Sequence, residues 1–229
     1  MRLSGKTALV TGANRGIGFE LCRQLGNEGA KVLAGVRHQG EETLSALTSD
    51  GFDVSIISID TSDPDSVLSA CKGLSEAVDI LINNAAILDR GSILSLKDED
   101  LESVIRINLL GPMLLAKKLA AGMRERKWGR IVNVSSGMGA ISRGLGADSG
   151  AYRVTKLALN GFTICLAEAL RGTGVLVNSV DPGWVRTAMG GSMAHRTPEE
   201  GARSIMHAVL LPDRGASGLF FRDGRKVDW

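Results

Sequence analysis

The only tyrosine of this chain, Tyr152, stands four residues before Lys156 in the segment YRVTK. Residues four apart share one face of a helix, so a helix here would bring the lysine ammonium close to the phenol. A free tyrosine has a pKa of about 10, and a nearby cation lowers this value toward the pH at which a general acid or base works. Tyr152 could then protonate a carbonyl oxygen as a hydride reaches the carbonyl carbon. The spacing also fits an ordinary surface pair, so it needs support from other motifs.

A glycine-rich turn lies near the start of the chain. The segment TGANRGIG places Gly12, Gly16 and Gly18 between an apolar run and a stretch with helical spacing. At the carboxyl edge of a parallel sheet, such a turn presents the N–H groups of a helix start, and glycines let a pyrophosphate approach the backbone. The spacing is GxxxGxG, whereas the common dinucleotide motif is GxGxxG, so an ordinary tight turn is the alternative.

The next apolar run ends in GVRHQG, which contains no acidic residue. Folds that bind NAD place an acidic side chain about twenty residues after the glycines, whereas an arginine suits the 2′-phosphate of NADP. Arg37 lies at this strand end and Arg15 lies inside the glycine turn, so two guanidinium groups could hold one phosphate. We therefore expect NADP(H) as the cofactor, with two solvated surface arginines as the alternative.

Short apolar runs alternate with longer stretches of helical spacing along the chain. The runs are rich in Val, Ile and Leu and end at turn residues, which is typical of strands buried on both faces. The six predicted strands are Thr7 to Gly12, Lys31 to Val36, Val54 to Asp60, Asp79 to Ala85, Arg130 to Ser136 and Val175 to Gly183. The predicted helices include Phe19 to Glu28, Asp63 to Leu74, Asp98 to Arg126 and Tyr152 to Leu170. This alternation requires crossover connections and predicts an α/β fold, a doubly wound parallel β-sheet with helices on both faces.

Two features of the C-terminal part extend this pattern. The segment TPEE, from Thr197, is typical of the capped start of a further helix. The residues LFF lie between turn residues in DRGASGLFFRDGRKVDW and predict a last edge strand. No linker divides the chain, so we expect a single domain over residues 1–229, with a cofactor half at about 1–135 and a catalytic half at about 136–229.

The composition is that of an ordinary globular protein, with 44% hydrophobic and 23% charged residues. The 27 basic and 25 acidic residues leave a net charge of +2, which argues against nucleic acid or a membrane surface as a partner. No apolar run approaches membrane-spanning length, and the N-terminal residues show no leader pattern. We therefore expect a cytoplasmic protein.

Cysteines and histidines suggest neither a disulfide framework nor a metal site. The cysteines are widely spaced, fall in predicted helices and are expected as inert core thiols: Cys22, Cys71 and Cys165. The histidines are too scattered to share a metal ion and are expected at the surface: His38, His195 and His207. No metal is therefore expected.

The motifs TGANRGIG, NNAA, RINLLG, IVNVSS, YRVTK and VDPGWVRT follow one another in this order. Over nearly its whole length the chain resembles the classical short-chain dehydrogenase/reductase family, and WVRTAMGG with GLFFRDGRKVDW resembles its carbonyl-reductase-like branch. The resemblance implies a Rossmann-type fold. It also implies an NADPH-dependent oxidoreductase that reduces a small-molecule carbonyl compound, an aldehyde, ketone or quinone, to an alcohol.

The resemblance implies catalytic roles as well. Tyr152 would be the general acid, and Lys156 would lower its pKa and bind the nicotinamide ribose. Ser136 would bind and polarise the substrate carbonyl, in preference to Ser135. Asn108 would hold a water that connects Lys156 to solvent, with a helix cap or a buried structural amide as the alternative.

In the same way, the resemblance implies a cofactor site. Asp60 would contact the adenine, the segment Asn84 to Ala86 would line a ribose, and residues after the sixth strand would lie against the nicotinamide and the phosphates. The full predicted set is Gly12, Asn14, Arg15, Gly16, Ile17, Gly18, Arg37, Asp60, Thr61, Asn84, Ala85, Ala86, Tyr152, Lys156, Pro182, Gly183, Val185 and Thr187.

Two positions depart from the family pattern. The family's NNAG reads NNAA here, so Ala86 adds a methyl group, which is tolerated if its φ is negative and could otherwise crowd the cofactor. The loop between Ser136 and Tyr152 is slightly longer than is common in the family, but much shorter than the insertion of monomeric carbonyl reductases. A homodimer or homotetramer is therefore plausible, with contact faces on the helices that begin near Asp98 and Tyr152.

The substrate is expected to be a hydrophobic aldehyde or ketone, because the loops carry no cluster of Arg or Lys that demands an anion. Apolar candidates for the pocket wall, which could equally be core, are Met138, Ile141, Leu145, Trp184, Met189 and Met193. The main alternative is a dinucleotide-sensing regulator with a catalytically idle fold, although such a protein could dispense with the tyrosine and lysine. A larger epimerase or dehydratase of the same superfamily would need a longer C-terminal substrate domain.

Overall fold

The computed structural model describes residues 1–37, 41–74 and 77–229. These residues form one eight-stranded sheet in the order β3-β2-β1-β4-β5-β6-β7-β8. The strands are β1 (Thr7–Thr11), β2 (Lys31–Val36), β3 (Val54–Ser58), β4 (Ile80–Asn83), β5 (Gly129–Val134), β6 (Val175–Val180), β7 (Phe220–Arg222) and β8 (Arg225–Lys226). Neighbouring strands from β3 through β7 are parallel, and β8 runs antiparallel to β7. The predicted parallel sheet is confirmed.

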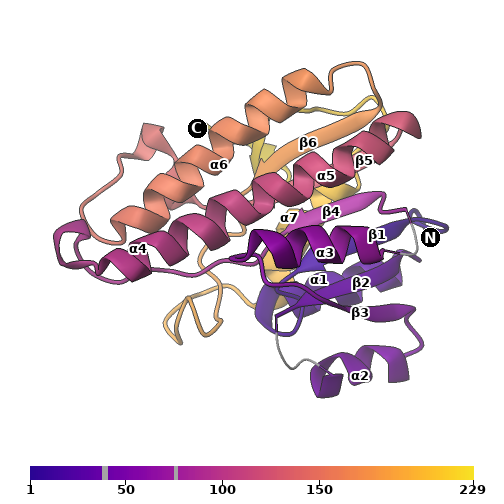
Figure 1. Cartoon of the computed structure of the whole chain (residues 1–229), viewed down its shortest axis with the longest axis horizontal. Coiled ribbons are helices and arrows are strands. Elements are labelled where there is room, and N and C mark those ends of the chain that lie inside the picture. Colours follow the sequence, from indigo (N-terminus) through magenta and orange to yellow (C-terminus); the bar gives the residue numbers. More distant parts are fainter. Residues whose placement is uncertain (38–40, 75–76) are drawn as a thin grey trace.

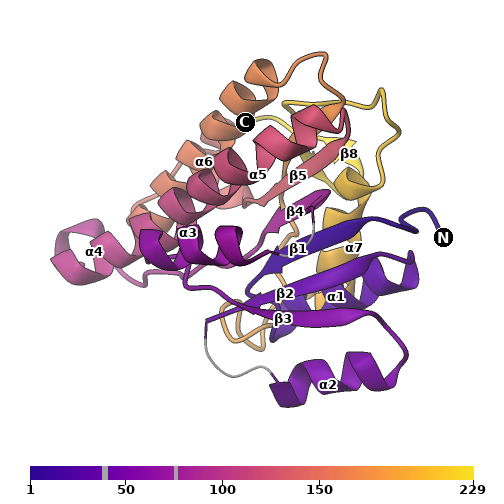
Figure 2. The same cartoon turned by 45° about the vertical axis from the view of Figure 1, so that its right-hand side comes forward.

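Helices cover both faces of this sheet, as Figures 1 and 2 show. They are α1 (Gly16–Asn27), α2 (Glu41–Ser49), α3 (Pro64–Gly73), α4 (Asp98–Ile105), α5 (Gly111–Glu125), α6 (Gly150–Ala169) and α7 (Pro198–Val209). In Figure 1, α3, α5 and α6 lie in front of the sheet, and α1 and α7 lie behind it. The fold is therefore the doubly wound Rossmann-type arrangement that the sequence predicts.

The strand order reverses between β1 and β4. From β1 the chain adds β2 and then β3 on one side, and it returns to the other side of β1 with β4. In open α/β sheets, ligands bind outside the carboxyl ends of the strands at such a reversal. The glycine turn that follows β1 and the NNAA segment at the end of β4 both lie at this reversal of the strand order.

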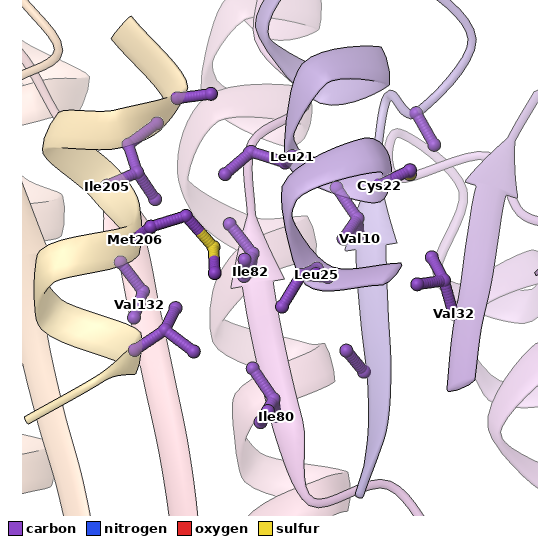
Figure 3. Packing of buried hydrophobic residues seen from close by; sticks show 14 of the residues in the cluster. Val10, Leu21, Cys22, Leu25, Val32, Ile80, Ile82, Val132, Ile205 and Met206 are labelled. Atoms are coloured by element: carbon purple, nitrogen blue, oxygen red, sulfur yellow. The ribbon is translucent and has the colours of Figure 1, made fainter. Parts of the chain in front are cut away.

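The core behind the sheet joins α1 and α7 to the strands (Figure 3). Leu21 and Leu25 of α1 and Met206 of α7 lie on Ile82 of β4 and Val132 of β5. All five side chains are at most 4% exposed. This packing fixes the start of α1 relative to the end of β1.

The opposite face is built from the alternate residues of the same strands. Leu9, Leu81 and Ile131 point toward the core under α3, α5 and α6, whereas their neighbours Val10 and Ile82 belong to the core behind the sheet. Side chains alternate between the two faces of a strand, and both faces are covered. This explains why these strands read as continuous apolar runs.

Several predicted boundaries needed correction. Helix α2 was not predicted, because its segment EETLSALTS has little apolar periodicity. The long helix expected from Asp98 to Arg126 contains a π-helical turn at Arg106–Leu110 between α4 and α5. Phe220 and Phe221 of the LFF segment form β7 together with Arg222, but β8 pairs with β7, so β7 is not the edge strand. The TPEE segment starts α7 with a complete capping box, as predicted.

Other predictions concerned isolated side chains. Cys22 is buried and Cys71 half-buried, but Cys165 is exposed on α6, so the prediction of three core thiols was wrong for Cys165. His195 is exposed, His207 is half-buried against Phe221, and His38 lies outside the described residues. Among the helices that the structure describes, none combines the length and apolar character needed to cross a membrane.

Candidate active site

A cavity of about 1460 Å³ lies over the carboxyl ends of β1, β4, β5 and β6. Its lining includes the residues that directly follow each of these strands, namely Gly12, Asn84, Ser135 and Asp181. The volume exceeds the roughly 300–1,000 Å³ of ordinary ligand pockets, so the cavity has room for a dinucleotide together with a small second molecule.

The structure places every predicted cofactor-site residue in the lining of this cavity. These residues are Gly12, Asn14, Arg15, Gly16, Ile17, Gly18, Arg37, Asp60, Thr61, Asn84, Ala85, Ala86, Tyr152, Lys156, Pro182, Gly183, Val185 and Thr187. Ser136 lines it as well, whereas Asn108 does not. Residues from 12 to 187 in the sequence thus meet at one edge of the sheet.

The glycine turn leaves the start of α1 free of side-chain caps. Arg15 is the N-cap residue with an extended backbone, and its side chain makes no capping hydrogen bond. Gly12 and Gly16 have φ of +65° and +54°, a region that favours glycine. A Cβ on Gly18 would lie 2.0 Å from the Gly12 carbonyl oxygen, so only glycine allows this approach of helix and turn. The N–H groups of the first turn of α1 are therefore available to a phosphate.

Asn84 ties the end of β4 to the end of β1. Its Nδ2 donates to the carbonyl oxygen of Thr11 over 2.9 Å, and Thr11 Oγ1 accepts from the backbone N–H groups of Asn84 and Ala85 at 3.0 Å each. These bonds hold the two turns together on the cavity floor. The φ of Ala86 is not positive, so its methyl group causes no backbone strain, as the sequence analysis required.

Arg15 and Arg37 follow the ends of the neighbouring strands β1 and β2, and both are exposed where they line the cavity. Asp60 follows β3 on the same side, and its Oδ1 accepts from the backbone and side chain of Ser62 at 2.8 and 2.6 Å. Two guanidinium groups thus lie at the end of the cavity where the sequence predicts the 2′-phosphate of NADP.

The tyrosine sits in the first turn of α6 and is 8% exposed. Helix α6 begins at Gly150, and its N-cap residue Ser149 has a left-handed backbone and no capping bond from its side chain. Instead, the buried carboxylate of Asp89 accepts from the N–H groups of Ala151 and Tyr152, at 3.3 and 2.7 Å. A residue from the loop after β4 therefore fixes the position of the phenol.

Lys156 follows one turn later on the same face of α6. Its Nζ donates to the carbonyl oxygen of Val134 over 2.7 Å and lies 5.5 Å from the centre of the Tyr152 ring. Burial lowers the pKa of Lys156 to about 7. The predicted placement of the amine beside the phenol is confirmed, and the amine can exchange protons near neutral pH.

The predicted lowering of the Tyr152 pKa is not what the structure shows. Burial raises the pKa of Tyr152 to about 12, because the phenolate is poorly solvated there; the side-chain hydrogen bond with Ser136 opposes this shift, and the negative charge of Asp181 adds to it. The phenol thus keeps its proton at neutral pH. Such a group is a proton donor, not a base, under these conditions.

The two serines at the end of β5 differ in their surroundings. Ser136 Oγ accepts from the N–H of Met138 at 3.1 Å, and its interaction with the Tyr152 side chain lowers the pKa of that phenol. Ser135 is buried, and its hydroxyl donates to the carbonyl oxygen of Lys156 over 3.3 Å. Both serines line the cavity, and Ser136 is the one whose side chain acts on the phenol, so its preference over Ser135 stays a prediction.

Asn108 lies behind the cavity wall on the π-helical turn and is fully buried. Its Oδ1 accepts from the N–H of Ile87 at 2.9 Å, and its Nδ2 donates to the Ile87 carbonyl oxygen at 2.8 Å and to Thr155 Oγ1 at 3.3 Å. These contacts match the alternative of a buried structural amide. The side chain links the loop after β4 to α6.

Apolar wall residues were predicted with partial success. Met138, Trp184 and Met189 line the cavity, whereas Ile141, Leu145 and Met193 do not.

Asp89 and Asp181, which act on Tyr152, were not predicted. Asp89 has no local signal because its partners are far along the chain, but Asp181 stands inside the VDPG motif. Within the described residues, no three His, Cys, Asp or Glu side chains form a group that could hold a metal ion.

Comparisons with known proteins identify oxidoreductases that resemble this chain in sequence. Oxidoreductase UcpA of Escherichia coli K12 is 37% identical over 211 residues, which cover 90% of this chain and 79% of that protein. The 3-oxoacyl-[acyl-carrier-protein] reductase FabG of Pseudomonas aeruginosa is 34% identical over 216 residues, 92% of this chain and 85% of the relative.

Solved structures show the same likeness in three dimensions. The NADPH-bound carbonyl reductase from chicken fatty liver superposes with a TM-score of 0.89 at 27% identity and covers 99% of this chain and 95% of its own. A metagenomic short-chain oxidoreductase in complex with NADP superposes with a TM-score of 0.81 at 32% identity, covering 95% and 96%. The family model described as short chain dehydrogenase matches residues 6–198, where the glycine turn, the serine and the tyrosine–lysine pair all lie. The chain therefore belongs to the short-chain dehydrogenase family.

Proposed function

We propose that this protein is an NADPH-dependent reductase that converts an aldehyde, ketone or quinone into an alcohol. One observation carries this proposal: the buried phenol of Tyr152, with Lys156 Nζ 5.5 Å from its ring centre, lines the same cavity as Ser136 and the glycine turn. The two relatives named as a carbonyl reductase and an oxoacyl reductase both act, by their names, on a carbonyl group.

The residues present fit NADP(H). The uncapped first turn of α1 suits the pyrophosphate, and Arg15 with Arg37 suits the 2′-phosphate that distinguishes NADP from NAD. No acidic residue occurs in GVRHQG at the end of β2 to bind a free ribose hydroxyl. Asp60, Thr61 and the Asn84–Ala86 segment would surround the adenosine and ribose parts, and Pro182, Gly183, Val185 and Thr187 the nicotinamide end.

The bound cofactor would supply the hydride that reaches the carbonyl carbon. Ser136 would donate a hydrogen bond to the carbonyl oxygen, and Tyr152 would give its proton to that oxygen as negative charge develops there. The raised pKa of Tyr152 suits the reduction reaction, because the phenol is protonated at neutral pH and can donate its proton. Lys156, with a pKa of about 7, would return a proton to the tyrosine from the solvent side.

The test is NADPH oxidation with a panel of aldehydes, ketones and quinones, for the wild type and for Tyr152→Phe. We expect the substitution to lower kcat by about 10²-fold or more, the range for loss of a general acid, with the NADPH dissociation constant unchanged. Turnover by the phenylalanine variant at the wild-type rate would reject the role of Tyr152. NADPH binding without turnover of any carbonyl would instead favour the dinucleotide-sensing regulator.

We also propose that two or four copies of this chain associate. Apolar side chains are exposed along α4, the π-helical turn and α6: Ile105, Leu110, Val154 and Ile164. Light scattering during size-exclusion chromatography gives the mass directly, and a mass of one chain would contradict this proposal. The cytoplasmic location and the two halves of a single domain stay predictions.

A further inference from the structure

Two arginines from distant parts of the chain converge on one buried carboxylate at the cavity. Arg143 ends a short 3-10 turn after β5, Arg222 ends β7, and Asp181 directly follows β6. Arg222 Nη1 donates to Asp181 Oδ2 over 3.4 Å, and Arg143 Nη1 lies 3.9 Å from the same oxygen. All three residues line the cavity.

This cluster borders the catalytic groups. A Cβ built on Gly137, which directly follows Ser136, would lie 2.6 Å from Arg143 Nη1 and 2.9 Å from Asp181 Oδ2. The charge of Asp181 also acts on the Tyr152 phenol. The guanidinium groups are therefore close to the position where Ser136 and Tyr152 would hold a carbonyl oxygen.

The charges of the cluster do not cancel. Arg222 also lies 4.0 Å from Asp223, whose carboxylate binds Arg196. Three guanidinium groups thus face two carboxylates. Two further arginines that line this part of the cavity, Arg90 and Arg186, donate to backbone carbonyl oxygens. Asp148, another acid that lines the cavity, pairs with Arg153, and the carbonyl oxygen of Trp229 accepts from the Ser142 N–H beside Arg143.

The exposed fractions of these side chains show that the cluster presents positive charge to the cavity. The Asp181 side chain is 5% exposed and its other oxygen accepts from the Gly183 N–H at 2.9 Å, whereas Arg143 and Arg222 are 44% and 35% exposed. Arg222 alone would offset the buried carboxylate. Within the described part of the chain, the guanidinium of Arg143 has only the 3.9 Å ion pair as a partner, and the half-exposed side chain lines the cavity.

We propose that the carbonyl substrate is an oxo acid, whose carboxylate is held by Arg143 and Arg222 while its carbonyl group lies at Ser136 and Tyr152. A carboxylate fits because the planar guanidinium fork binds its two oxygens together. This inference rests on the proposed function and names the substrate class of that same site. The sequence alone predicted a neutral substrate because the arginines lie in separate segments.

The experiment compares oxo acids with their methyl esters as substrates of the NADPH-dependent reaction. The acids carry the carboxylate one, two or three carbons from the carbonyl, and each ester keeps the same skeleton without the charge. Enzymes to compare are the wild type, Arg143→Gln and Arg143→Lys, with Arg171→Gln as a control, since Arg171 is 77% exposed and pairs with Glu168. Arg222→Lys tests the second arginine without leaving Asp181 unpaired.

For at least one acid, we expect the wild type to show kcat/KM about tenfold or more above the ester. Arg143→Gln should remove this preference, mainly through the KM of the acid, so that the acid loses far more kcat/KM than its ester. Arg143→Lys should retain part of the preference, because it keeps the charge but loses the fork. Equal use of acids and esters by the wild type, or an equal loss for both in Arg143→Gln, would overturn the inference while leaving the reductase function intact.

Failure of the proposed function has a different signature, namely no NADPH oxidation with acids, esters or the neutral carbonyl panel. Calorimetry with the same oxo acids and esters, in the presence of NADP⁺, would then measure their binding and test the proposed carboxylate site independently of catalysis. Tighter binding of the acid by the wild type, lost in Arg143→Gln, would support the site. Equal affinities for acid and ester would refute it.

Discussion

The backbone N–H of Tyr152 donates to Oδ1 of Asp89 over 2.7 Å, so a carboxylate 63 residues earlier in the chain caps the helix that carries the tyrosine. The other oxygen of this carboxylate accepts from the preceding N–H group, that of Ala151, at 3.3 Å. Negative charge at a helix start is favourable, because the N–H groups there lack partners within the helix. The loop after β4 thereby fixes the rotation and the start of α6.

Asp89→Ala should therefore weaken both stability and catalysis. We expect a loss of about 1 to 2 kcal/mol in the free energy of unfolding, the usual cost of removing a helix cap, and a lower kcat because the phenol is less well positioned. Urea unfolding and NADPH oxidation measure the two effects. Asp89→Asn keeps an acceptor and should lose less of each; an alanine variant with wild-type stability would show that the cap is dispensable.

The two serines at the end of β5 offer a matched pair of substitutions. Ser136→Ala should lower kcat by about 10²-fold, because it removes a hydrogen bond to the developing oxyanion. Ser135→Ala should change kcat little, since its hydroxyl donates to the Lys156 carbonyl oxygen inside the protein. Steady-state kinetics of both variants with one ketone decide between them. A larger loss in Ser135→Ala would reverse the assignment.

Much of the fold could be predicted because its signals are local. Runs such as Ile80 to Ile82 are apolar at every position, since alternate side chains enter the two cores. The start of α7 follows from the capping box at Thr197. Helix α2 was missed because its segment lacks these signals, and β8 because two residues are too short for a pattern.

The site was predictable where motifs keep their residues together, as in TGANRGIG and YRVTK. Relationships between distant segments could not be predicted. Asp89 and Arg143 have no distinctive sequence context. Asp89 meets the start of α6, and Arg143 meets Asp181 after β6, only when the chain folds. The raised pKa of Tyr152 has the same origin, because burial depends on everything packed around the phenol.

Cofactor choice should depend on Arg37. Arg37→Asp removes a cation from the predicted 2′-phosphate site and adds an acid that can accept from a free ribose hydroxyl. We expect the ratio of kcat/KM for NADPH to that for NADH to fall by about 10- to 100-fold, which is the effect of losing one or two hydrogen bonds to a charged group. Arg15→Gln should weaken NADPH without improving NADH. An unchanged ratio in Arg37→Asp would contradict the phosphate role.

Asp181→Asn tests the electrostatic control of Tyr152. The carboxylate raises the Tyr152 pKa, so its neutral amide should lower that pKa from about 12, while its oxygen can still accept from the Gly183 N–H. Reduction needs the phenol, which is present below the pKa and lost as the pH rises through it. The alkaline limb of the reduction profile should therefore move to lower pH.

In the reverse reaction, the same fall in the Tyr152 pKa should raise the rate, because alcohol oxidation needs the phenolate as a base. At a fixed alkaline pH below the wild-type pKa, Asp181→Asn holds more phenolate and should oxidise a neutral alcohol faster with NADP⁺. Asp148→Asn is the matched control, since Asp148 lines the same cavity but pairs with Arg153 and does not act on the Tyr152 pKa. Profiles should be recorded with uncharged substrates, so that changes in anion binding do not enter. A shift of the reduction limb to higher pH in Asp181→Asn would refute the proposed coupling of these two residues.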